Sequence, residues 1–252
     1  MKRRTVLTGM AAAASALALG RAQGNSNVAD AGPAAVQGCS LITQDITGPY
    51  FLDARQVRSD IAEGLPGLPL QLDFIVTNQF SCKPLPGAHV HIWHCDAAGR
   101  YSGVINTLLD MNDRPSGEII DLTDSFFLRG MQTSDAEGRV RFLTIVPGWY
   151  APRPTHLHLK VYPPTPGEVA TTQLYFPPAF CNEAYKHEAY AARGPSPNQN
   201  DHRTYAADSS ADEAELWITP VTVGTGYQHT MELGVTFYGT DFGNLGKFYD
   251  QG

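Results

Sequence analysis

The sequence predicts an all-β fold, an antiparallel β-sandwich with long loops and one short helix. Three observations support this prediction. Several short segments alternate apolar and polar residues with a period of two, which is typical of half-buried strands. Glycine (24) and proline (18) are plentiful and mark turns between these segments. Helical periodicity is scarce, so short strands joined by turns are expected over most of the 252 residues.

The predicted strands follow one another from residue 70 onward. The first has apolar residues on one face from Leu70 to Val76, with Gln71 and Asp73 on the other face. A Pro/Gly turn at 83–87 precedes a strand over 88–93, and a turn at 135–138 precedes the next strand. Further alternating stretches cover 156–161 and 230–237. An antiparallel sandwich lets each of these strands bury one face.

The chain from residue 39 to 252 is predicted to be one domain, because no repeat, low-complexity block or linker interrupts it. One short helix is predicted over 181–193, and the polar, proline-rich stretch 194–213 is predicted to be a long surface loop. Residues 23–38 are small and polar, which is typical of a flexible lead-in.

Residues 1–22 are predicted to be an export signal peptide of the twin-arginine type. Arg3 and Arg4 are followed by an apolar run from Met10 to Leu19 and then by small residues. A membrane anchor is disfavoured, because a run of ten residues is too short to cross a bilayer. We therefore expect a periplasmic or secreted protein that has no membrane association once the signal is removed.

The charge of the chain excludes some partners. Residues 1–22 carry four basic and no acidic side chains, so their removal takes the formal charge from −7 to −11. An acidic surface disfavours nucleic acid and anionic lipid, because both require a basic face. The net charge does not indicate whether the chain assembles, so the sequence leaves a homo-oligomer as an open alternative.

The four cysteines allow two disulfides in an exported protein, with three pairings that the sequence cannot distinguish. Their spacing matches no zinc-ribbon or CxxC pattern, so a cysteine-bound metal is not expected. The cysteines are Cys39, Cys82, Cys95 and Cys181.

The candidate site lies in residues 147–158. On a strand, His156 and His158 project from the same side, and two adjacent imidazoles suit a transition metal. Tyr150 lies just upstream, in a segment that prolines stiffen. Such a histidine pair can also be a plain solvated strand face. We expect that of the second pair, His89 and His91, which has no comparable neighbours.

The remaining metal ligands could be carboxylates or phenolates. A site with two histidines and one carboxylate needs a nearby acid, and none lies between Val140 and Glu168. Phenolate is the other hard anionic ligand and suits Fe(III), which deprotonates a bound tyrosine far below its normal pKa. Tyr150 and Tyr101 are the tyrosines considered, although Tyr101 taken alone is better explained as a loop aromatic residue packed on the sandwich.

A family resemblance bears on this choice. Eight segments, matching in order and spacing over about residues 39–178, resemble the intradiol ring-cleavage dioxygenases, and the chain is most similar to their exported single-domain branch. The last seventy residues match weakly apart from the final strand. The segments are 48–51, 57–61, 84–88, 92–103, 127–130, 147–150, 153–158 and 172–176.

The resemblance implies an Fe(III) enzyme that cleaves a small aromatic diol with O2. It implies that Tyr101 is a tyrosinate ligand that stays bound and that Tyr150 is one that substrate releases. His156 and His158 match the imidazole ligands. Arg153 matches a cation that stabilises charge developing on the ring, and Gln173, seventeen residues past His156, matches a site glutamine.

Two other interpretations are considered. A transthyretin-like or carbohydrate-binding sandwich could carry the turns at 84–88 and 135–138, but it would not need Tyr150, Arg153, His156 and His158 together. An exported zinc or copper protein could use both histidine pairs. Within the dioxygenase interpretation the substrate stays open, and nothing in the sequence places Arg55, Arg58 or Arg100 where it could bind a substrate carboxylate.

Overall fold

The computed structural model describes residues 41–53, 56–109, 115–165, 168–201 and 217–237. Within them the chain forms two four-stranded sheets and a two-stranded hairpin. The predicted export signal at 1–22, the lead-in at 23–38 and residues 202–213 of the predicted surface loop lie outside the described residues.

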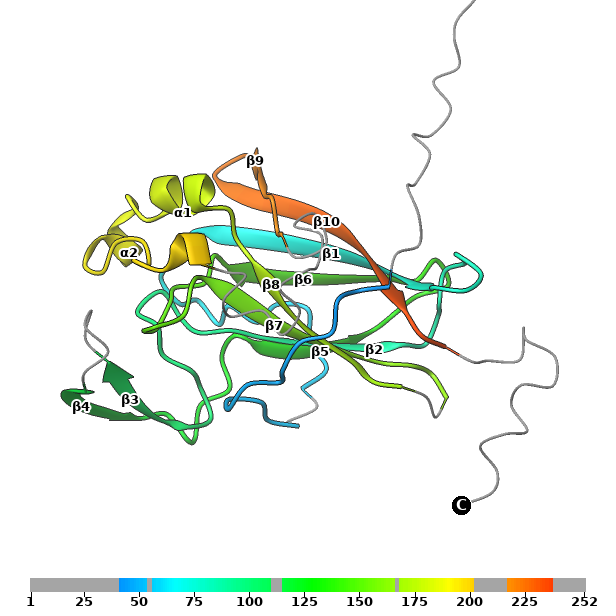
Figure 1. Ribbon diagram of the computed structural model, residues 1–252, viewed down its shortest axis with the longest axis horizontal. Coiled ribbons are helices and arrows are strands. Elements are labelled where there is room, and N and C mark those ends of the chain that lie inside the picture. The colour runs from blue at the N-terminus through cyan, green and yellow to red at the C-terminus, as the bar shows by residue number, and fades with distance from the viewer. Residues whose placement is uncertain (1–40, 54–55, 110–114, 166–167, 202–216, 238–252) are drawn as a thin grey trace, which may run out of the picture. The chain divides into compact units, whose positions relative to one another are not determined.

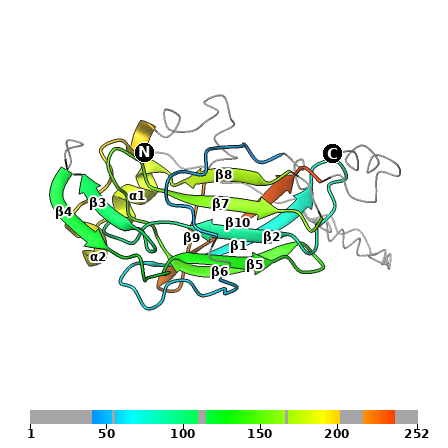
Figure 2. The same cartoon turned by 90° about the horizontal axis from the view of Figure 1, so that it is seen from below.

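The two sheets lie face to face (Figure 1). The first has the order β6-β1-β10-β9, made of Arg139–Ile145, Pro69–Asn78, Gly226–Val235 and Val221–Val223. The second has the order β5-β2-β7-β8, made of Arg129–Thr133, His89–Trp93, His156–Tyr162 and Ala170–Tyr175, and Figure 2 shows these four side by side. The predicted β-sandwich is confirmed. One pair, β1 with β10, is parallel, whereas the other pairs in both sheets are antiparallel.

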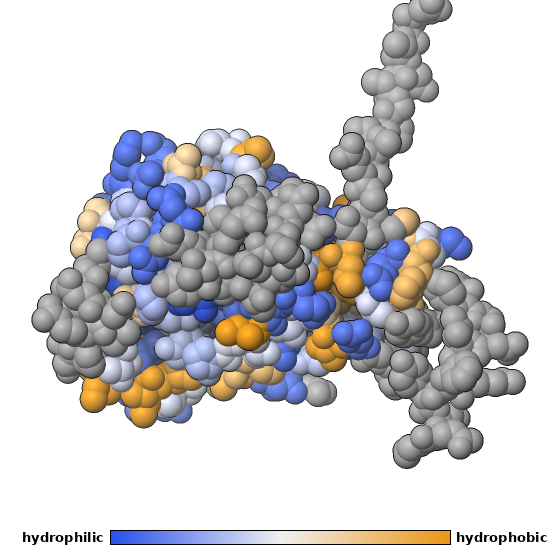
Figure 3. Space-filling view, in the orientation of Figure 1, coloured by the Kyte–Doolittle hydropathy of each residue, from blue (hydrophilic) through white to orange (hydrophobic). Residues whose placement is uncertain are grey.

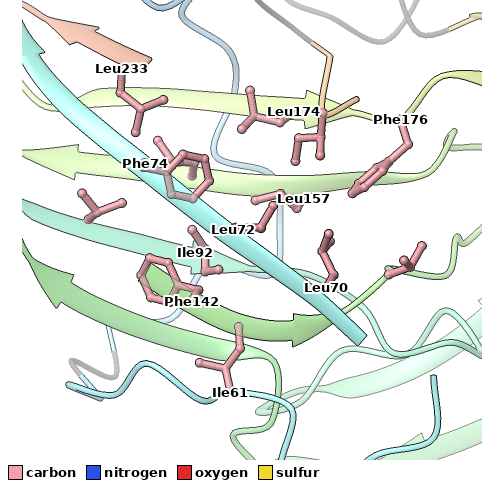
Figure 4. Close-up of a cluster of buried hydrophobic side chains, with 14 of the residues drawn as sticks. Ile61, Leu70, Leu72, Phe74, Ile92, Phe142, Leu157, Leu174, Phe176 and Leu233 are labelled. Atoms are coloured by element: carbon pink, nitrogen blue, oxygen red, sulfur yellow. The ribbon is translucent and has the colours of Figure 1, made fainter. Parts of the chain in front are cut away.

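The core lies between the sheets, as the period-two alternation predicted. Leu72 and Phe74 of β1 and Phe142 of β6 point toward Ile92 of β2 and Leu157 of β7 (Figure 4). Each is almost fully buried, and burying one such side chain contributes about 1.5–3 kcal/mol. This core makes β2 and β7 a rigid support for whatever their outer faces carry.

The hairpin of β3 (Ile105–Leu109) and β4 (Pro115–Asp121) stands apart from both sheets (Figure 1). Ile105 and Ile119 are exposed on it, and hydrophobic surface gathers at that corner of the molecule (Figure 3). Its other face points inward, where the side chain of Asn106 is buried. The hairpin is therefore joined to the sandwich through the residues around Asn106.

The single helix predicted over 181–193 is wrong, because two short helices occupy this stretch. They are α1 (Pro178–Ala184) and α2 (Glu188–Ala191). His187 is extended and its ring accepts a hydrogen bond from the Ala189 amide, so it starts a new helix instead of continuing α1. A 3-10 turn, Gln199–Asp201, follows. In the described part of the chain, neither helix is long and apolar enough to span a bilayer.

The two disulfides that the cysteine count allows are not both formed. Cys95 and Cys181 are free thiols in the buried interior, whereas Cys82 is disulfide-bonded. Cys39, the remaining cysteine, lies outside the described residues. A free thiol is compatible with burial because cysteine packs as a small apolar side chain.

Candidate metal centre

The strand β7 places His156 and His158 on one side, with Leu157 and Leu159 in the core on the other. The two rings are 1% and 0% exposed, so a solvated strand face is excluded for this pair. Their Nε2 atoms lie 3.2 Å apart. Two ring nitrogens therefore converge on one buried point.

The tautomer of His156 follows from its partner. Its Nδ1 lies 2.7 Å from the carbonyl oxygen of Pro154, which can only accept a hydrogen bond, so Nδ1 carries the proton. Nε2 is left with its lone pair directed toward His158. Burial lowers the pKa of His156 to about 3 and that of His158 well below its ordinary value. Both rings are thus neutral near pH 7, which is the form that binds a metal.

The orientation of His158 is fixed from both sides. The ring of Trp93, its register partner on β2, stacks on it with centroids 4.9 Å apart and planes 6° apart. Gly48 lies on another side, where an added Cβ would come within 2.8 Å of His158 Cε1. A metal-binding ring held in this way loses little conformational freedom on binding.

Replacing Gly48 with alanine is expected to weaken metal binding. The residue has a positive φ of 75°, so a side chain adds backbone strain, and its Cβ would push the His158 ring. We expect at least tenfold weaker metal affinity, because a ligand shifted by about 1 Å costs on the order of a hundredfold in function. Gly64→Ala is the matched control, since Gly64 also has positive φ but nothing within 4 Å. Equal metal loss in both variants would assign the effect to backbone strain alone.

The two predicted tyrosines meet the histidines. The Tyr101 ring lies 5.7 Å from that of Tyr150 and 6.1 Å from that of His158, and Tyr150 lies 5.6 Å from His156, all between centroids. Tyr101 comes from the loop after β2, and Tyr150 from the loop before β7. The four rings predicted as ligands therefore form one cluster.

The Tyr101 hydroxyl is buried and has no hydrogen-bond partner in the described part of the chain. An unsatisfied buried hydroxyl costs about 1–3 kcal/mol, so such an atom requires an explanation. Burial also raises the pKa of Tyr101 and of Tyr150 above their ordinary values. A bound cation would reverse this effect and favour the phenolate.

This donor set fits Fe(III). Two imidazole nitrogens and two phenol oxygens are intermediate and hard donors, and the orphaned Tyr101 oxygen is satisfied once it binds a cation. Within the described residues, no group of three or more His, Cys, Asp or Glu side chains forms a metal site. The tyrosine oxygens of Tyr101 and Tyr150 are the anionic donors that this cluster could add to His156 and His158.

The backbone of Tyr101 is held by Asn106 of β3. The Asn106 side chain accepts a hydrogen bond from the Tyr101 amide at 2.7 Å and donates to the Tyr101 carbonyl at 2.8 Å. The buried guanidinium of Arg129 binds the carbonyl oxygens of Ser102 and Tyr50 and lies 5.9 Å from the Tyr101 ring. Burial lowers the pKa of Arg129 to about 10, so the group still stays charged near pH 7.

The structure also brings Arg153 and Gln173 together. Arg153 Nη2 donates to Gln173 Oε1 at 2.5 Å and to the Tyr175 hydroxyl at 3.3 Å. Gln173 and Tyr175 lie on β8, directly opposite His158 and His156 of β7. All six residues named from the sequence thus lie in one region at the start of β7.

Sequence reasoning missed several residues of this cluster. Tyr50 stacks on Tyr101 with centroids 4.3 Å apart and meets Tyr150 edge-on at 5.6 Å. Trp93, Asn106 and Arg129 were not singled out either. Tyr50, Trp93 and Arg129 lie in the segments 48–51, 92–103 and 127–130 on which the resemblance rests, so a signal for them existed, whereas Asn106 lies outside all eight segments.

The expectation that the second histidine pair is solvent-exposed is confirmed for His89 and wrong for His91. His89 is exposed, but His91 is buried, with its ring 6.4 Å from Phe51 and 5.1 Å from Tyr162. Phe51 packs on this part of β2, against His91 and Trp93, which alternation within the strand could not reveal. The two pairs do not share a site, so the zinc or copper interpretation gains no support from the described residues.

The basic side chains considered for a substrate carboxylate are engaged elsewhere. Arg58 donates to the Arg129 carbonyl at 2.9 Å and pairs with Glu63, and Arg100 pairs with Asp96 at 2.6 Å. Arg55 lies outside the described residues. Among the described residues, two guanidinium groups lie beside the ring cluster: Arg129 is bound to the backbone carbonyls of Ser102 and Tyr50, whereas Arg153 is bound to the side chains of Gln173 and Tyr175.

Comparisons with known proteins find dioxygenases. A family model described as Dioxygenase matches residues 46–192. The chain is 36% identical over 121 residues to the protocatechuate 3,4-dioxygenase beta chain of Burkholderia cepacia, which covers 44% of this chain and 47% of that protein. The chain therefore spans about half the length of this curated relative.

Solved structures give the same result over more of the chain. An intradiol ring-cleavage dioxygenase from Tetranychus urticae is similar with a TM-score of 0.63 and 25% identity, over 79% of this chain and 95% of that one. The dioxygenase domain of a dioxygenase and carbohydrate-binding protein fusion from Streptomyces sp. SirexAA-E gives 0.55 and 28%, over 78% and 99%. The matched residues contain the whole ring cluster, and the chain belongs to the intradiol ring-cleavage dioxygenases.

Proposed function

We propose that this chain is an Fe(III)-dependent dioxygenase that cleaves a catechol-type aromatic diol with O2 to a muconate-type diacid. The observation that carries the proposal is the meeting of two buried imidazole nitrogens with two tyrosines, one of which has an unsatisfied buried hydroxyl. The family to which the chain belongs supports it. Both atoms of O2 enter the product, and the bond between the two oxygenated carbons is broken.

His156, His158, Tyr101 and Tyr150 would hold Fe(III), and the chemistry that the ion would supply is Lewis-acid activation of the diol, with electron density drawn from its ring. The chain supplies the ligands and the bases. His156 and His158 are neutral donors, and Tyr101 and Tyr150 are the anionic ones. Tyr101 is fully buried and its backbone is held by Asn106, whereas Tyr150 is partly exposed. This difference supports Tyr101 as the ligand that stays and Tyr150 as the one that leaves.

Tyr150, once released as a phenolate, would be a base that could accept a proton from a hydroxyl of the bound diol. Arg153 provides a positive charge whose direction is set by Gln173 and Tyr175. Such a fixed charge stabilises negative charge that develops on the substrate ring, a contribution of about 3 kcal/mol in comparable sites. Trp93 stacks on His158 and Tyr50 stacks on Tyr101, so these two aromatic rings shield the cluster from water.

We also propose that the protein is exported, as residues 1–22 predict. The disulfide at Cys82 supports this, because disulfides persist in oxidising compartments. Fusion of residues 1–22 to a reporter enzyme, followed by cell fractionation, measures it. Retention of the reporter in the cytoplasm would contradict export.

The activity is tested with the purified chain and a panel of catechols, among them catechol, protocatechuate and hydroxyquinol. We expect about one iron per chain, a red-brown colour from tyrosinate-to-iron charge transfer, and O2 uptake as ring absorbance disappears. The product should contain both atoms of O2 and two new carboxyl groups. His156→Ala is the control and should lose colour and activity together. A colourless, iron-free protein with full activity would contradict the assignment of four iron ligands.

A further inference from the structure

The loop of residues 146–155 joins β6 to β7 and carries Tyr150 and Arg153 immediately before His156. It has no strand partner of its own, so its position must be set by other contacts. Buried backbone groups need partners, and these partners show what holds the loop. The backbone amides of Val146 and Gly148 donate to Leu68 and Asp96, and residues 185–199, which follow α1 in the chain, supply partners to five further backbone groups of the loop.

Seven side chains from these two segments make hydrogen bonds between them, and one of the seven is Thr155, whose hydroxyl lies 2.5 Å from that of Tyr185. The Tyr190 and Tyr185 hydroxyls donate to the carbonyl oxygens of Val146 and Pro147 at 2.8 and 2.7 Å. The Trp149 indole donates to the Gly194 carbonyl at 2.8 Å. The other three side chains, Ser196, Asn198 and Gln199, act on the part of the loop that carries Arg153 and His156.

Ser196, Asn198 and Gln199 hold three positions of the loop between residues 152 and 155. The Asn198 side-chain amide donates to the Pro152 carbonyl at 2.6 Å, and the Ser196 hydroxyl donates to the Arg153 carbonyl at 3.0 Å. The Gln199 side chain accepts from the Thr155 amide at 2.9 Å and donates to the Phe176 carbonyl at 2.8 Å. We call these three residues the loop clamp.

Gln199 links two elements of the site. Thr155 precedes His156 at the start of β7, and Phe176 follows Tyr175 at the end of β8, which holds Arg153 through Gln173 and Tyr175. Ser196 and Gln199 are 5% and 4% exposed, so water does not readily replace their bonds. The Arg153 backbone is therefore held by Ser196, whereas its side chain is held by Gln173 and Tyr175 of β8.

We infer that the loop clamp of Ser196, Asn198 and Gln199 positions Arg153 and His156 for metal binding and ring cleavage. These are positioning residues, since they act through the backbone of the loop. The family match ends at residue 192, so the clamp lies outside the part of the chain on which that match rests. The catalytic consequence of this inference rests on the proposed function, but the physical restraint does not.

The test compares Gln199→Met and Ser196→Ala with Asn78→Ala. Methionine keeps the size of glutamine but removes both hydrogen bonds. Asn78 is the matched control, because it is also a buried amide that donates to a backbone carbonyl, that of Phe237, and it does not contact the loop. Hydrogen exchange of the 150–158 peptide is measured in each protein, together with iron content, the visible absorption band, kcat and KM.

We expect at least tenfold faster exchange in 150–158 for Gln199→Met, with a shifted absorption band and weaker iron retention. For Ser196→Ala we expect full iron content and about a tenfold loss in kcat with little change in KM, since a small displacement of a positioned group is costly. Ser196→Thr restores the hydroxyl and should recover kcat. Asn78→Ala should leave the exchange of 150–158 and the absorption band unchanged.

The inference is overturned if exchange of 150–158 stays at the wild-type rate in both clamp variants, or if Asn78→Ala disturbs the loop equally. If the wild-type protein holds iron but opens no catechol ring, the proposed function fails. The visible absorption band of the clamp variants then still tests whether the loop clamp positions the metal ligands. If the wild-type protein holds no iron, hydrogen exchange alone decides whether the clamp restrains the loop.

Discussion

Tyr101→Phe is expected to remove most of the iron without destabilising the metal-free protein. The substitution deletes one oxygen, and that oxygen is buried without a hydrogen-bond partner in the described part of the chain. Deleting it relieves an unsatisfied group and should leave the metal-free protein equally stable or about 1 kcal/mol more stable. The phenylalanine ring can keep its place against Tyr50, and Asn106 still holds the backbone.

Iron binding should change in the opposite direction. The variant lacks an anionic donor, so we expect at least tenfold less iron after equal exposure and loss of most of the visible band. Metal analysis and thermal unfolding of the metal-free protein measure the two effects. Tyr190→Phe is the matched comparison for stability, because the Tyr190 hydroxyl accepts from Leu68 and donates to Val146, so its removal should lower the melting temperature. Stoichiometric iron in Tyr101→Phe would contradict the four-ligand assignment.

The sandwich could be predicted from the sequence because the strand period is local. Leu70 to Val76, and Leu157 with Leu159, alternate in the chain as they do in the structure, and each set packs into the core. The parallel pairing of β1 with β10 could not be predicted, because it joins distant segments without changing the alternation of either. The break between α1 and α2 depends on His187 capping the second helix, a contact that helical periodicity does not encode.

The candidate site could likewise be predicted only in part from the sequence. His156 and His158 follow from the strand period, but their burial does not, since the same pattern at His89 leaves one ring exposed. Tyr101 was named through the family resemblance alone, because its approach to His158 depends on a loop after β2. Trp93 meets His158 through the register of β2 and β7, and such pairing is not readable from either strand by itself.

Arg153→Met should leave iron binding intact and reduce kcat/KM by about a hundredfold to a thousandfold, the range found when one charge-stabilising donor is removed. Arg153 contacts Gln173 and Tyr175 and is not one of the four proposed ligands, so the tyrosinate-to-iron band should keep its position. Methionine preserves much of the volume, which separates the loss of charge from the loss of packing.

Two further variants separate charge from geometry at this position. Arg153→Lys keeps the charge but lacks the guanidinium fork, so it should recover only part of the activity. Gln173→Leu removes the acceptor that orients Arg153, and it should reduce kcat less than Arg153→Met does, because Tyr175 still holds the guanidinium. Steady-state kinetics with the best diol of the panel, run beside absorption spectra of the same samples, measure both. If Arg153→Met retained full kcat/KM with a normal iron band, the positive charge would have no part in ring cleavage, and the role of stabilising the ring anion would pass to the metal alone.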